Sequence, residues 1–106
     1  DEEAAAKTPF GGTIAHGFLT LSLASAMSYD AVERLDGVVM GVNYGTNKVR
    51  FPSPVPVGSR LRAGAKLLDA QDFVGGIQIT VEATFEIEGA AKPSCVAELV
   101  FRTYFA

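Results

Sequence analysis

Residues 16–29 carry apolar side chains around most of a helical wheel. A helix that is apolar on most sides is buried on most sides, so the pattern predicts a buried helix here. The apolar positions are Phe18, Leu19, Leu21, Leu23, Ala24, Ala26 and Met27. Its polar side chains are few and small, namely Thr20, Ser22, Ser25 and Ser28. A shorter helix is predicted over residues 1–7, because Pro9 and the following Gly-Gly pair end it.

Residues 77–88 alternate between apolar and polar side chains through six periods of two, which is typical of a strand with one buried face. Further strands are predicted over residues 38–51 and 59–68, separated by a stretch whose three prolines exclude a central strand. A last strand begins near Cys95. Odd-numbered apolar positions define one face of the two C-terminal strands: Ile77, Ile79, Val81, Ala83, Phe85, Ile87, Cys95, Ala97, Leu99, Phe101 and Phe105.

One apolar helix followed by strands predicts an α+β fold, in which a long antiparallel sheet wraps around the helix. The odd-numbered face of residues 77–105 is the surface expected to cover that helix. Four strands leave part of an entirely apolar helix uncovered. An extra strand from upstream, or a second subunit in a homodimer, is therefore expected to cover the remainder.

The chain has 106 residues, which suits one domain spanning 1–106. Its net charge of −3 argues against general nucleic-acid binding. One cysteine and one histidine make a structural zinc site unlikely by composition, and no apolar run reaches the length of a membrane span. The chain starts at Asp1 without a methionine, so we expect that an N-terminal portion precedes it. A cytoplasmic location is expected.

The middle of the chain is basic although the whole is acidic. Between Gly37 and Leu68 there is no Asp or Glu, and the span carries +5, which leaves −8 for the remainder. A local basic patch on an acidic protein suits a phosphorylated small ligand, and the alternative is a solvated strand face. The basic residues are Lys48, Arg50, Arg60, Arg62 and Lys66, and the nearby polar ones are Asn43, Tyr44 and Asn47.

The junction at His16 and Gly17 is the first candidate for chemistry. A backbone N–H left free at a helix start can polarise a carbonyl oxygen, and glycine allows close approach of a ligand. The alternative is that the histidine only caps or packs locally. Ser25 has a similar pair of interpretations: a small residue that allows close packing, or a hydroxyl that orients a catalytic group. Cys95 is expected to be a buried small hydrophobic residue.

Three segments carry a resemblance to a known family. They are Phe10-Gly-Gly-Thr-Ile-Ala-His-Gly17, Asn43-Tyr-Gly-Thr-Asn-Lys-Val-Arg-Phe51 with Pro54-Val-Pro-Val-Gly58, and Ala91-Lys-Pro-Ser-Cys-Val-Ala-Glu98. The chain resembles the MaoC-like dehydratases of the hot dog fold, which include the (R)-specific enoyl-CoA hydratases. The resemblance implies reversible hydration of a trans-2-enoyl thioester to the (R)-3-hydroxyacyl thioester. In that family an Asp, and a His five residues later, activate the water; by the family's spacing both are expected before Asp1.

Two catalytic roles carry over from the resemblance: Gly17 as the oxyanion-hole N–H, and Ser25 as the residue that positions the Asp. The expected substrate contacts are His16, Tyr44, Asn47, Lys48 and Arg50. The expected partners are an acyl-CoA or acyl-carrier thioester and a second copy of the chain, with no nucleic acid and no membrane. No metal or redox cofactor is implied, and coenzyme A enters as part of the substrate. The rival interpretations are a hot dog module that binds thioesters without turnover, and a thioesterase, whose helix would need an acid or amide that is not found there.

Overall fold

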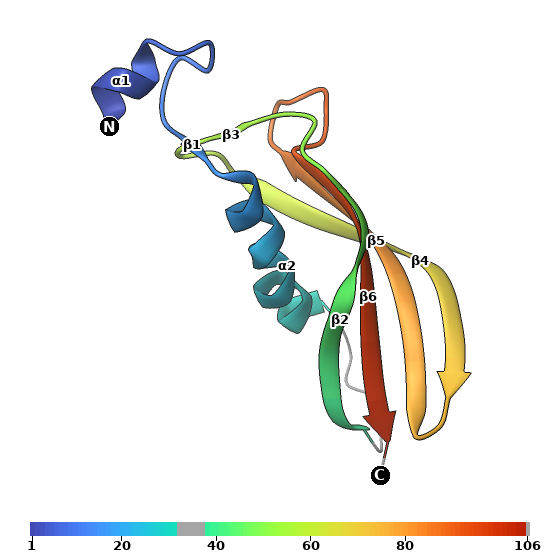
Figure 1. Cartoon of the computed structure of the whole chain (residues 1–106). Coiled ribbons are helices and arrows are strands. Elements are labelled where there is room, and N and C mark those ends of the chain that lie inside the picture. The colour runs from blue at the N-terminus through green and yellow to red at the C-terminus, as the bar shows by residue number, and fades with distance from the viewer. Residues whose placement is uncertain (32–37, 106) are drawn as a thin grey trace.

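The computed structural model describes residues 1–31 and 38–105, with the side chains of 1–24 and 39–105. Two helices and six strands follow one another along the chain (Figure 1). In chain order they are α1 (Glu2–Ala6), β1 (Ile14–Ala15), α2 (Gly17–Ala31), β2 (Val38–Arg50), β3 (Val55–Pro56), β4 (Leu61–Phe73), β5 (Gly76–Ile87) and β6 (Cys95–Phe105). The α+β class and the order of the two helices and four long strands are those predicted, whereas the two-residue strands β1 and β3 were not predicted.

Four long strands form one antiparallel sheet in the order β2-β6-β5-β4. The turn between β4 and β5 uses Gly75 at φ 92°, a left-handed conformation that glycine adopts without a steric penalty. β4 extends to Phe73, five residues further than predicted, because it pairs with β5 along nearly the whole of that strand. The proline-containing stretch contributes only the two-residue β3, which pairs with β1 outside the main sheet.

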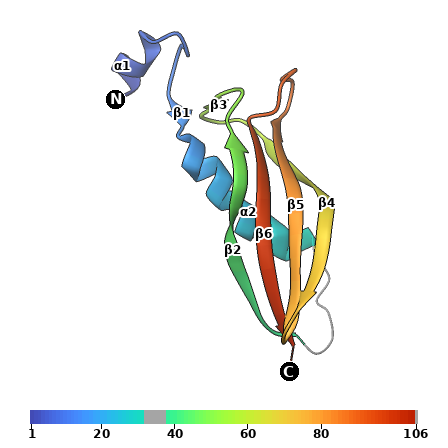
Figure 2. The ribbon, with the colours of Figure 1, turned by 45° about the vertical axis from the view of Figure 1, so that its right-hand side comes forward.

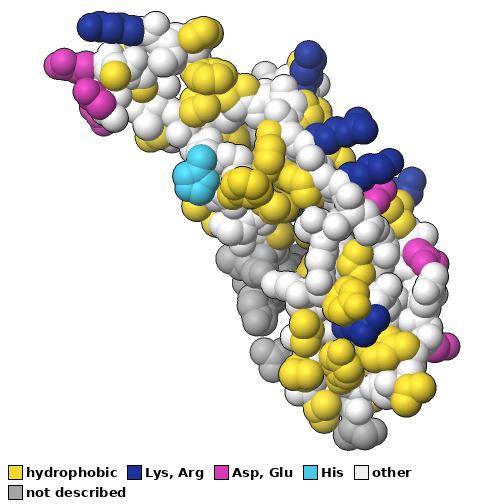
Figure 3. Space-filling model, viewed as in Figure 1, with side chains coloured by type: hydrophobic (Ala, Val, Ile, Leu, Met, Phe, Trp, Pro, Cys, Tyr) yellow, Lys and Arg dark blue, Asp and Glu magenta, His cyan; other side chains and the backbone are white. Residues whose placement is uncertain are grey.

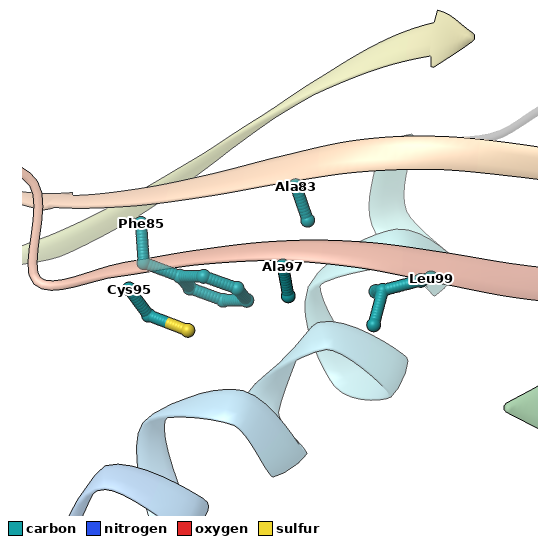
Figure 4. Close-up of a cluster of buried hydrophobic side chains, with 5 residues drawn as sticks. All are labelled: Ala83, Phe85, Cys95, Ala97 and Leu99. Atoms are coloured by element: carbon teal, nitrogen blue, oxygen red, sulfur yellow. The ribbon is translucent and has the colours of Figure 1, made fainter. Parts of the chain in front are cut away.

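Helix α2 lies against one face of the sheet, and the core is formed there (Figure 2). The buried cluster comes from the two central strands and is packed by Leu21 and Ala24 of the helix. All of its members are odd-numbered, which confirms the predicted face at these positions (Figure 4). They are Ala83, Phe85, Cys95, Ala97 and Leu99. The helix and the two central strands therefore share one apolar layer.

The prediction that the helix over residues 16–29 is buried on most sides is wrong for the side chains described. Thr20 is 2% exposed, but Phe18 is 73%, Leu19 43% and Leu23 37% exposed. The reason is geometric: the helix contacts the sheet mainly through β6, so no described residue of this chain covers the opposite side of the helix. The edge strand β4 is likewise exposed along most of its length.

The single chain is extended rather than compact. Its dimensions are 54 × 23 × 22 Å and its radius of gyration is 16.4 Å, whereas about 13 Å is typical of a domain of this size. Hydrophobic side chains gather on the surface in several places (Figure 3). No helix among the described residues is long and apolar enough to cross a membrane.

Candidate active site at the start of helix α2

His16 caps helix α2. Its Nδ1 accepts a hydrogen bond of 2.8 Å from the Leu19 N–H, and its carbonyl oxygen accepts one of 3.0 Å from the same N–H. A side chain that accepts from the third residue of a helix satisfies one of the N–H groups that every helix start leaves without a partner. The side chain is exposed, and because Nδ1 accepts, Nε2 is the ring nitrogen that carries the proton. The capping interpretation of His16 is therefore what the geometry shows.

Gly17 is the first residue of the helix, so its N–H has no carbonyl one turn earlier within the helix to bond. Among the hydrogen bonds formed by described residues, none starts from this N–H. The chain just before it is held by the pairing of Ile14 with Pro56 and of Ala15 with Val55. The pairing of β1 with β3 thus fixes the segment that precedes the helix, and the His16 cap fixes the first turn of the helix.

Phe51 reaches Gly17 from the end of β2. A Cβ placed on Gly17 would lie 2.8 Å from Cδ1 of the Phe51 ring, so the ring occupies the space that any larger residue needs. The ring of Phe18 meets that of Phe51 edge to face, with centroids 5.9 Å apart and planes at 82°. The sequence did not predict this aromatic pair, since no spacing rule connects positions 18 and 51.

Ser25 belongs to α2, but its side chain lies outside the described residues. Its predicted positioning role therefore stays a prediction.

The structure separates the predicted basic patch into paired and unpaired groups. Arg62 bonds Glu86 at 2.7 Å, and Arg60 lies 3.6 Å from Glu88, so the neighbouring strand compensates both. Within the described chain, Lys48, Arg50 and Lys66 have no carboxylate within 4 Å. Arg50 precedes Phe51 in the sequence, but its neighbour Val49 packs against the core, so the Arg50 side chain lies on the sheet face opposite α2.

Tyr44 and Asn47 lie elsewhere. They line a hollow of about 240 Å³ together with side chains of β5 and β6, including Gln78 and Thr80. Both β5 residues are even-numbered, so the hollow opens on the sheet face opposite the helix. Tyr44 also stacks on Arg102. The structure thus keeps His16 and Gly17 at the start of α2 and places Tyr44, Asn47 and Arg50 away from them, with Arg50 on the opposite face of the sheet.

A second hollow, of about 360 Å³, lies between the N-terminal segment and β3. It was not predicted, because it depends on a loop folding back over Pro56 and Val57. Its lining residues are Glu2, Phe10, Gly11, Gly12, Thr13, Pro56 and Val57.

Cys95 is fully buried, and burial raises the pKa of its thiol. A buried neutral thiol is a poor nucleophile, in agreement with its place in the core. In the part of the chain that the structure describes, no group of three His, Cys, Asp or Glu side chains is arranged to hold a metal ion.

The profile of the family described as MaoC like domain matches residues 1–89. The chain belongs to this family. The MaoC-like chain is 52% identical over 103 residues to the 3-hydroxyacyl-thioester dehydratase Z of Mycobacterium tuberculosis, covering 96% of this chain and 68% of that protein. It is 48% identical over 101 residues to the Nodulation protein N of Rhizobium leguminosarum bv. viciae, covering 93% of this chain and 62% of that protein.

Solved structures agree with the MaoC-like assignment. A monoamine oxidase regulatory protein from Archaeoglobus superposes with a TM-score of 0.81 at 26% identity, over 100% of this chain and 70% of that one. The (R)-hydratase from A. caviae involved in PHA biosynthesis superposes with a TM-score of 0.76 at 24% identity, over 95% and 70%. The predicted hot dog fold is confirmed.

Proposed function

We propose that this MaoC-like chain contributes to the reversible hydration of a trans-2-enoyl thioester, giving the (R)-3-hydroxyacyl thioester. The observation that carries the proposal is the Gly17 N–H, which has no partner among the described residues and stands at the start of a 15-residue helix. The relatives named as a thioester dehydratase and an (R)-hydratase support this class of reaction.

Hydration of an enoyl thioester develops negative charge on the carbonyl oxygen. A backbone N–H aimed at that oxygen stabilises the charge, and removal of such a donor typically costs about 10²–10³ in kcat. The positive end of the α2 dipole adds to this stabilisation. Proton transfer to and from water requires an acid and a base, which the family resemblance assigns to an Asp and a His before Asp1, with Ser25 holding the Asp.

Coenzyme A, or the phosphopantetheine arm of a carrier protein, enters the reaction as part of the substrate in this proposal. Lys48, Arg50 and Lys66 are the cations available to its phosphates, because Arg60 and Arg62 are paired with glutamates. No metal or redox cofactor takes part, and the protein acts in the cytoplasm.

The proposed assembly is a homodimer. Leu19 and Leu23 of α2 leave apolar surface uncovered, and the edge strand β4 exposes Leu67 at 61% and Leu68 at 42%. An unpaired edge together with an open apolar helix face is a surface that a second copy covers by edge-to-edge pairing. Light scattering at micromolar concentration is expected to give twice the chain mass, and a monomeric mass would contradict the dimer.

The alternative function is a hot dog module that holds acyl thioesters without turnover. Two measurements separate it from the enzyme. The first follows the Gly17 amide resonance of the 106-residue chain during titration with butyryl-CoA, a saturated thioester that cannot be hydrated. The second follows loss of the enoyl absorbance of crotonyl-CoA with the intact protein. The enzyme requires a Gly17 shift and turnover; binding without turnover identifies the module, and an unmoved Gly17 amide contradicts both.

A further inference from the structure

The two rings beside Gly17 leave much of their surface in water. Phe18 is 73% exposed and Phe51 is 41% exposed, although they form an edge-to-face pair. Such a pair contributes about 0.5–1.5 kcal/mol beyond its burial, and packing within this chain covers little of Phe18. The core cluster of the chain includes neither ring. The two rings therefore pack at the N-terminal end of α2 and not in the core of the fold.

The contact between Phe51 and Gly17 places the two rings at the proposed thioester site. The Phe51 ring fills the space of a Cβ on Gly17, so it lies directly against the residue whose N–H is proposed to hold the thioester oxygen. Any carbonyl bound there has its two substituents within a few bonds of the rings. One substituent is an apolar acyl chain, and the other is a thioester arm that carries amides in need of hydrogen-bond partners. Two phenyl rings offer apolar contact and no hydrogen bonds.

We propose that Phe18 and Phe51 form the wall against which the acyl chain packs, and that they set the acyl length this site prefers. The inference rests on the proposed thioester-binding function. Phe51, in contact with Gly17, meets the first carbons of the acyl group, and Phe18 meets the carbons further out. Longer acyl chains then gain affinity by covering the exposed ring of Phe18.

The test compares Phe18→Ala and Phe51→Leu with the unaltered chain, using butyryl-CoA and octanoyl-CoA as ligands in calorimetric titrations. The matched control is Phe105→Ala, a phenylalanine that is 41% exposed, as Phe51 is, and lies at the far end of β6. The unaltered chain is expected to bind octanoyl-CoA more tightly than butyryl-CoA. Phe18→Ala should reduce that preference about tenfold, within the range that apolar pockets reach for small changes in size. Phe51→Leu keeps an apolar side chain and should weaken both ligands.

Unchanged ratios in both variants, with both ligands still bound by the unaltered chain, overturn this inference and leave the proposed function standing. A loss of affinity that is equal for the two ligands in Phe18→Ala and accompanies a halved mass in light scattering also overturns it, because the ring is then a subunit contact. If the unaltered chain binds neither thioester and the intact protein does not hydrate crotonyl-CoA, the proposed function is wrong. The proposed acyl contact of Phe18 and Phe51 is then wrong as well.

Discussion

The guanidinium carbon of Arg102 lies 3.9 Å from the ring centre of Tyr44 and 4.7 Å from that of Phe73. Its Nε also donates a 2.9 Å hydrogen bond to Gln78. Tyr44 reaches this position because β2 has an irregularity between Asn43 and Gly45 that shifts the register against β6. Irregularities of this kind redirect a side chain. Here the redirected Tyr44 connects the edge strand β2 to Arg102 of β6.

Replacement of Tyr44 by Leu is expected to lower the free energy of unfolding by about 1 kcal/mol, since a cation–π contact at a partly exposed site is worth about 0.5–2 kcal/mol. Tyr44→Phe keeps the ring and should leave stability nearly unchanged. Urea unfolding of both variants measures the difference. The same pair tests the predicted substrate contact: a hydroxyl that binds substrate requires a raised KM in Tyr44→Phe at unchanged stability.

Loss of the His16 cap should also be measurable. His16→Ala leaves the Leu19 N–H without its side-chain acceptor, and is expected to cost about 1 kcal/mol of stability. His16→Asn supplies another good capping side chain and should recover most of that loss. Because the cap holds the turn that carries Gly17, kcat of the intact protein should fall more in His16→Ala than in His16→Asn. Equal losses in the two variants would show that the ring acts otherwise than as a cap.

Gly12 and Gly17, five residues apart in the sequence, give a matched comparison. A Cβ on Gly17 overlaps the Phe51 ring, whereas a Cβ on Gly12 meets nothing within 4 Å. Gly17→Ala is expected to lower the free energy of unfolding by about 1–3 kcal/mol, as overpacking usually does. It should also lower kcat about tenfold, because it displaces the Gly17 N–H. Gly12→Ala should leave kcat and the melting temperature close to those of the unaltered protein. Similar behaviour of the two variants would remove the special role of Gly17.

The unpaired cations predict a pattern in KM. Charge reversal in Lys48→Glu, Arg50→Glu or Lys66→Glu should raise KM for crotonyl-CoA and leave kcat nearly unchanged, the signature of lost uniform binding. Arg62→Glu is the control, because Glu86 already neutralises this exposed arginine and it should change KM least. Added salt should reduce the differences, since exposed charges are screened. A KM that is insensitive to all the reversals would identify the patch as ordinary surface.

The alternation of residues 77–88 was enough to predict β5 and its buried face, because period-two patterning depends only on local sequence. The apolar run of residues 16–29 predicted α2 for the same reason. The exposure of Phe18 and Leu19 could not be predicted in this way, since burial depends on how many strands reach the helix. The same limit applies to the site: the Gly17 motif was visible, but its contact with Phe51 joins residues 34 positions apart and requires the folded sheet.

Pairing across strands was another property hidden from the sequence. The register of β4 against β5 sets Arg62 directly opposite Glu86, and the two side chains form an ion pair. The pairing of β4 with β5 thus neutralises Arg60 and Arg62, two of the five cations predicted to bind phosphate. Knowledge of the strand pairing, rather than of composition, was needed to choose among the five basic residues.

The extended shape of the chain has a thermodynamic consequence. Among the described residues only six apolar side chains are buried, while the apolar surfaces of α2 and β4 remain open. If a second copy covers those surfaces, association and folding share one equilibrium, and mass action then governs stability. The melting temperature should therefore rise with protein concentration, and dilution alone should unfold the chain. The cell would tune the amount of folded protein through the level of its expression.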